Sequence, residues 1–162
     1  MSARRVVVGL HWPNEDFGDS AAWEFDPGRV YRRASRRGRN PWGLWTSPKT
    51  SANGWNRCTA ARELGIIGDH HWEITVDITG MLRLTAEQDV PAEFGWEVSE
   101  LGFGLGGWEV DWRCVQDAGY SGLHVSRYRR SDDPQLWWAQ LDCDCTVAWD
   151  LDAVLEVSGP FR

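Results

Sequence analysis

The sequence lacks the features that mark several common protein classes. No apolar run approaches the ~20 residues that a membrane-spanning helix needs, so we expect no membrane association. The first ten residues hold two arginines and three valines, but no apolar stretch followed by a small-residue cleavage site. We therefore expect no secretory signal and a cytoplasmic location.

Cysteine is scarce, and its spacing fits no familiar framework. The chain has four cysteines and no C-x-x-C pair; they are Cys58, Cys114, Cys143 and Cys145. A chain of this length does not need disulfides to stabilise its core, so we expect reduced thiols. A zinc site would have to recruit His70 or His71 from far along the chain, and we expect no metal.

Two catalytic loop motifs are also missing. The glycine-rich stretch at residues 102–107 lacks the lysine and hydroxyl residue of a phosphate-binding loop, which favours a connector. No G-x-S-x-G sequence is present, so a hydrolase nucleophile elbow is not predicted.

The totals indicate one domain with an uneven charge. The 162 residues are 42% hydrophobic and 25% charged, which is ordinary for a globular domain spanning residues 1–162. A formal net charge of −7 disfavours nucleic acid as a partner. Six arginines nevertheless fall between residues 29 and 39, which predicts a local anion site.

Local patterns predict an α+β fold. Alternation of apolar and polar residues is clearest at residues 71–78, and Gly80 is expected to turn the chain into a partner strand at 81–85. Helices are predicted at 51–64 and 109–118, the second ended by Gly119, with further helix entries near Thr85 and Asp89. Other strands are expected at 4–10, 29–35, 42–47, 122–128, 136–141 and 146–149, followed by a strand or short helix at 150–157. We expect mostly antiparallel or mixed β-sheets with two or three short helices.

Tryptophan is abundant, with twelve residues. Most are expected to fill the core, each needing a partner for its indole N–H; we expect this of Trp72, Trp112, Trp149 and either Trp137 or Trp138. The segment 41–48 is different, because Trp42 and Trp45 lie beside Thr46 and Ser47, directly after the arginine run. An arginine can grip a phosphate, an indole can stack on a flat ring, and a hydroxyl can bind a ribose.

Acidic residues gather near the C-terminal cysteines. A carboxylate from Asp142 or Asp144 could hold a ribose diol or stabilise a cation-like transition state, although each could instead cap a turn. The histidines, including His11, lack ligand spacing and are interpreted as surface or structural residues.

These motifs, in this order, resemble a group of small phage and actinobacterial proteins related to ADP-ribosyltransferases. The resemblance covers about residues 29–152. It rests on Tyr31 and Arg32; on Gly43, Leu44, Trp45 and Ser47; on Asp111, Trp112, Tyr120 and Gly122; and on Asp142, Cys143, Trp149 and Asp150.

The resemblance implies NAD as substrate and transfer of ADP-ribose to an acceptor. Arg32 would hold the NAD together with Tyr31, and Thr46 or Ser47 would support the nicotinamide ribose. Trp45 or Trp42 would stack on the ring. The late catalytic glutamate of the family is missing, since His124 stands where an acid is expected, and Asp142 or Asp144 would have to substitute. The implied fold is a split pair of small β-sheets with a ligand cleft between them.

Three other functions remain open. A non-enzymatic inhibitor, phage-encoded, could bind a host protein through exposed tryptophans. A nucleotide-sequestering protein would keep the cleft without turnover. A nucleic-acid-binding module could use the arginine run and stacking aromatics, although the net charge disfavours it.

Overall fold

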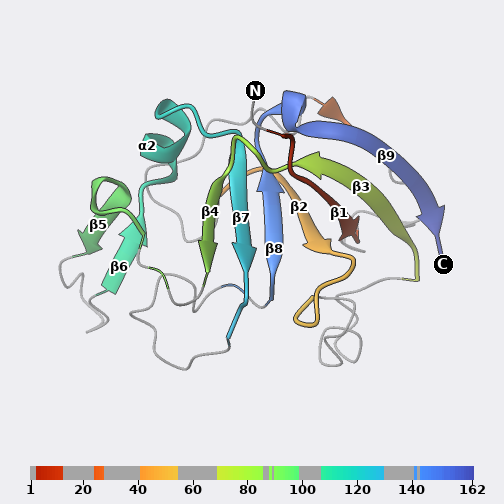
Figure 1. The fold of residues 1–162 in the computed structure, drawn as a ribbon, viewed down its shortest axis with the longest axis horizontal. Helices are drawn as coiled ribbons and strands as arrows, with labels where there is room; N and C mark the ends of the chain where they lie inside the picture. The colour runs from red at the N-terminus through yellow and green to blue at the C-terminus, as the bar shows by residue number, and fades with distance from the viewer. Residues whose placement is uncertain are drawn as a thin grey trace.

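The computed structural model describes most of the chain (Figure 1). The described residues are 3–12, 24–27, 41–54, 69–85, 88, 90–98, 107–129, 141 and 143–162. Several predicted features lie outside them: the strand at 29–35, all but Leu141 of the strand at 136–141, Trp137, Trp138, residues 102–106 of the glycine-rich stretch and most of the helix at 51–64.

One seven-stranded sheet dominates the molecule, with strand order β4-β7-β8-β2-β1-β3-β9. Its strands are β1 (Val6–His11), β2 (Leu44–Pro48), β3 (His71–Asp77), β4 (Leu82–Thr85), β7 (Gly122–Ser126), β8 (Cys145–Ala148) and β9 (Val154–Phe161). A separate hairpin pairs β5 (Gly95–Val98) with β6 (Gly107–Val110). The described helices are α2 (Trp112–Asp117) and two 3-10 turns, η5 (Ala92–Phe94) and η6 (Leu151–Ala153).

The predicted α+β class with a mixed sheet is confirmed in outline. All described pairings are antiparallel except that of β4 with β7. The strands do not form the expected split pair of small sheets, since β8 joins β7 on one side to β2 on the other.

Two local predictions were wrong. The strand at 81–85 exists, but it pairs in parallel with β7 rather than forming a hairpin with β3. The helix predicted from residue 109 begins at Trp112, because Glu109 and Val110 belong to β6 and pair with Trp96 and Gly95.

Helix α2 has clear signals at both ends. The Asp111 carboxylate accepts a hydrogen bond from the Cys114 N–H at 3.1 Å, an N-cap that typically stabilises a helix by about 1 kcal/mol. Gly119 follows the last turn with φ +87°, a conformation that glycine adopts without a steric penalty. The prediction that Gly119 ends this helix is confirmed.

The sheet carries a core on each of its two sides. At the β4-β7-β8 end, Leu82, Leu84, Leu123, Val125 and Val147 pack with α2 and η5, and we call this side of the sheet the helix side. At the β1-β3-β9 end the core lies on the opposite side, where Trp72, Ile74 and Val76 pack with Leu44, Ala148 and Ala153. At the β4-β7 end, the side of the sheet that faces away from α2 therefore carries polar side chains.

The predicted core tryptophans Trp72, Trp112 and Trp149 are buried. The indole N–H of Trp149 donates to the Tyr120 carbonyl at 2.5 Å, as expected for a buried indole. The Trp112 indole N–H has no hydrogen-bond partner in the described part of the chain. None of the helices in that part combines the length and the apolar character needed to cross a bilayer.

Candidate functional site

The segment predicted to bind a nucleotide ring forms β2 and the residues before it. Trp42 is 52% exposed, whereas Trp45 is partly buried against the core on the helix side. The Trp45 indole N–H donates to the Pro41 carbonyl at 3.2 Å. Because side chains alternate along a strand, Trp45 and Ser47 share one side of the sheet and Thr46 points to the other.

Both hydroxyl groups of this segment are buried and bonded across the sheet. Ser47 Oγ donates to the Asp144 carbonyl at 3.3 Å, and Thr46 Oγ1 donates to the Thr146 carbonyl at 3.4 Å. These contacts join β2 to β8. The role of Thr46 and Ser47 in holding a nicotinamide ribose stays a prediction.

Three other predicted site residues, Tyr31, Arg32 and Asp142, lie outside the described residues. Their proposed roles in gripping NAD and in catalysis therefore remain predictions.

Asp144, the alternative acid, is 7% exposed and forms a buried hydrogen-bonded junction. One carboxylate oxygen accepts from the Ser51 hydroxyl, and the other accepts from the Tyr128 N–H at 2.6 Å. The Asp144 N–H donates to the Asn53 carbonyl at 3.0 Å, and the Asn53 amide donates to the Tyr128 carbonyl at 3.3 Å. Asp144 thus fastens the turn after β2 to the segment after β7, a structural role.

A row of polar residues crosses four strands on the side of the sheet opposite α2. Arg83 pairs with His124, His124 with Thr146, and Thr146 with Thr46, so all four lie on the same side. The row runs from the exposed Arg83 through the half-buried His124 to Thr146 and Thr46, which are 0% and 4% exposed. Ligand access to the row is therefore from the β4 end.

His124 is held by its neighbour in this row. Its Nδ1 lies 2.9 Å from the Thr146 hydroxyl. Burial lowers the pKa of His124 below its ordinary 6.5, and the charge of Asp144 opposes this only in part. The imidazole is therefore neutral at pH 7.

A second pair of hydroxyl residues follows the row along the strands. Thr85 pairs with Ser126, one position on from the Leu84–Val125 pair and two positions from Arg83 and His124. Arg83, Thr85, His124 and Ser126 consequently form a two-by-two array on adjacent parallel strands. We call these four residues the polar array.

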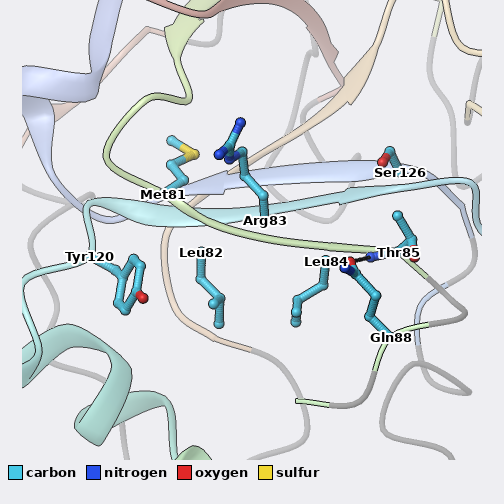
Figure 2. Close-up of a pocket in the computed structure, with 8 residues that line it drawn as sticks. All are labelled: Met81, Leu82, Arg83, Leu84, Thr85, Gln88, Tyr120 and Ser126. Carbon is cyan, nitrogen blue, oxygen red and sulfur yellow. Dashed lines mark hydrogen bonds between the residues drawn. The ribbon is translucent and has the colours of Figure 1, made fainter. Parts of the chain in front are cut away.

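Three members of the polar array line a pocket of about 430 Å³ at the edge of the sheet. Figure 2 shows Arg83 and Ser126 on one side of the strand ribbons and Leu82, Leu84 and Tyr120 on the other. Gln88 closes one end, since its side-chain oxygen accepts from the Thr85 N–H at 3.0 Å. The pocket thus joins cationic and hydroxyl groups to an apolar and aromatic wall, a composition common in small-molecule sites.

The sequence prediction missed this array. The alternation in Leu82-Arg83-Leu84-Thr85 already placed Arg83 and Thr85 on one side, but nothing local indicated that His124 and Ser126 would lie beside them. His124 was noted only as a departure from the family pattern.

The described cysteines form neither a disulfide nor a metal site. Cys114, Cys143 and Cys145 form no disulfide in the described part of the chain, and no group of His, Cys, Asp or Glu in that part has the arrangement of metal ligands.

The buried histidines predict a loss of stability in mild acid. Burial lowers the pKa of both His11 and His124 below 6.5, so the unfolded chain takes up protons before the folded one as pH falls. We expect the free energy of unfolding to be highest well above pH 6.5 and to fall as the pH drops through 6.5 toward the lowered pKa values, as measured by urea titration. His124→Gln should weaken this dependence, and an unfolding free energy that rises toward pH 5.5 would contradict the assignment.

Comparison of the chain with protein-family models, curated proteins and solved structures finds no match.

Proposed function

We propose that the chain binds a small phosphate-bearing ligand of the nucleotide type in the pocket beside β4. The observation that carries the proposal is that Arg83, Thr85 and Ser126 all line one pocket of about 430 Å³. A guanidinium forms strong charge-assisted hydrogen bonds with phosphate oxygens, and neighbouring hydroxyls add neutral donors. Tyr120, half-buried on the other side of β4, supplies an aromatic face for a base or sugar ring.

Binding should depend on the Arg83 charge. We expect Arg83→Ala to weaken binding of AMP or ADP by about tenfold or more in calorimetric titration, because a charge-assisted bond is lost. Arg162→Ala is the matched control, since Arg162 is also exposed but follows β9 at the far edge of the sheet. Equal loss in both variants, or no nucleotide binding by the unchanged protein, would refute the proposal.

Use of NAD as a substrate is the more specific proposal, and it comes from the family resemblance with its ADP-ribosyltransferase-like fold. Thr46 lies in the same cross-strand row as Arg83 and His124, but it is 4% exposed and donates to the Thr146 carbonyl. The NAD proposal is therefore carried by the resemblance and not by the position of Thr46. Incubation with NAD should release nicotinamide, and Arg32→Ala should abolish the release; binding without release would instead support a nucleotide-sequestering protein.

A non-enzymatic interaction function is the second candidate, and Trp42 favours it. An indole that is 52% exposed is a typical anchor at a protein interface. The partner would be a host or defence protein, and Trp42→Ala should abolish its capture while leaving AMP binding in the pocket beside β4 unchanged.

A further inference from the structure

The hydrogen-bond geometry around Thr146 fixes which nitrogen of His124 carries the proton. Thr146 is 0% exposed, and a buried hydroxyl must place its hydrogen on an acceptor. In the described part of the chain, the acceptor within reach of Thr146 Oγ1 is the Nδ1 of His124, at 2.9 Å. The hydroxyl therefore donates to Nδ1, and in the neutral ring the proton lies on Nε2.

This tautomer turns His124 into a hydrogen-bond donor toward any ligand. Its neighbour across the β4–β7 pairing is Arg83, which is a donor only, and the next pair along the strands is Thr85 and Ser126. Adjacent strands lie about 4.8 Å apart, so both members of each pair can reach one small group. Asp144 is the carboxylate whose charge acts on the pKa of His124. Both of its oxygens already accept hydrogen bonds, one from the Ser51 hydroxyl and one from the Tyr128 N–H.

A site made of donors selects a ligand rich in acceptor oxygens. A phosphate monoester offers three terminal oxygens to the guanidinium, the imidazole N–H and the hydroxyls. Each phosphate of a dinucleotide diphosphate offers only two, and a carboxylate offers two in one plane. The polar array therefore matches a terminal phosphate better than the bridging diphosphate of NAD.

We infer that His124, set as the Nε2–H tautomer by Thr146, donates a hydrogen bond to a terminal phosphate monoester that Arg83 grips. This inference rests on the proposed phosphate-binding function and names its ligand class. His124 contacts the ligand, whereas Thr146 acts through the ring as a positioning residue.

The test combines AMP and NAD titrations with histidine NMR at pH 7.5. The unchanged protein should bind AMP about tenfold more tightly than NAD, the difference expected from one additional charge-assisted hydrogen bond. His124→Leu should weaken AMP binding by about tenfold, whereas His124→Gln, which keeps an N–H donor, should stay within about threefold. Thermal unfolding of each variant confirms that it is folded.

NMR of ¹⁵N-labelled histidine gives a readout that a purely structural role would not move. His124 should show the Nε2–H tautomer, and Thr146→Val, which keeps the shape but removes the hydroxyl, should yield a mixture of both tautomers and weaker AMP binding. If His124→Leu does not fold, the tautomer and the Thr146→Val titration still decide the question.

The outcomes separate the two proposals. Binding of AMP that requires Arg83 but is unchanged in His124→Leu and Thr146→Val overturns the role of His124 alone. An Nδ1–H tautomer in the unchanged protein overturns it as well, and so does equal affinity for AMP and NAD. Absence of binding to AMP, ADP and NAD overturns the phosphate-binding function itself.

Discussion

Replacing Gly122 with alanine is expected to destabilise the protein by about 3 kcal/mol, the upper part of the range for overpacking in a core. A Cβ at this position would lie 2.3 Å from the Val147 carbonyl oxygen and 2.7 Å from the Met81 side chain. The first of these contacts is with the backbone of the adjacent strand β8, which cannot move without disturbing the β7–β8 pairing. For a chain of this length the melting temperature should fall by about 10 °C.

Gly80→Ala provides the control for Gly122→Ala. The atom nearest to a Cβ at Gly80 is the Ser121 hydroxyl, 3.2 Å away at the rotatable end of a side chain. We expect a change within about 0.5 kcal/mol. Comparable melting temperatures for the two variants would show that β7 and β8 do not approach as closely as the structure has them.

Replacing Asp144 with alanine is the second change with a large expected effect, also about 3 kcal/mol. The substitution leaves the Tyr128 N–H and the Ser51 hydroxyl without their acceptor. Each unsatisfied buried donor costs about 1–3 kcal/mol. Because the carboxylate joins the turn after β2 to the segment after β7, we also expect faster amide hydrogen exchange around residues 51–53 and 128.

Asp150→Ala is the matched control for Asp144→Ala. Asp150 caps the short turn η6 by accepting from the Asp152 N–H at 3.0 Å, without the second partner that Asp144 has. Loss of such a cap typically costs about 1 kcal/mol. If both aspartate variants unfold at the same urea concentration, the Asp144 carboxylate stabilises the protein no more than the Asp150 cap does.

Strands with one buried side were predictable from the sequence. The alternation Trp72, Ile74, Val76 gave β3 to within one residue, and the β-branched run at Val6–Val8 gave β1. Helix α2 was located but started too early, because Trp108-Glu109-Val110 suits a helix or a strand equally well. The N-cap Asp111 marks the true start, and it is a signal that the sequence already contained.

Strand pairing was not predictable in the same way. Gly80 favours a hairpin between β3 and β4, yet β4 pairs with β7, about forty residues later along the chain. Local periodicity reports which side chains are buried, and it carries no information about which distant strand lies alongside. The polar array depends on such a pairing, which is why Arg83 and His124 could not be joined from the sequence.

The segment predicted to bind a nucleotide also differs from the prediction in which side chains are exposed. Trp45 and Ser47 read as an exposed ligand platform because they follow an arginine run, but both lie on the helix side, where Trp45 packs against the core and Ser47 bonds to the Asp144 carbonyl. A tryptophan has the same sequence signature in a core and in a binding site. Only Trp42 in this segment is exposed.

The position of β8 has a consequence for how the molecule assembles on the ribosome. Within the described sheet, β8 is the sole bridge between the half formed by β4 and β7 and the half formed by β2, β1, β3 and β9. Its register with β2 joins residues about one hundred positions apart, as in Leu44 with Ala148. Nascent chains shorter than about 145 residues therefore lack the strand that joins β4 and β7 to β2, β1 and β3, and the unpaired edges of β7 and β2 invite chaperone binding or aggregation until β8 is available.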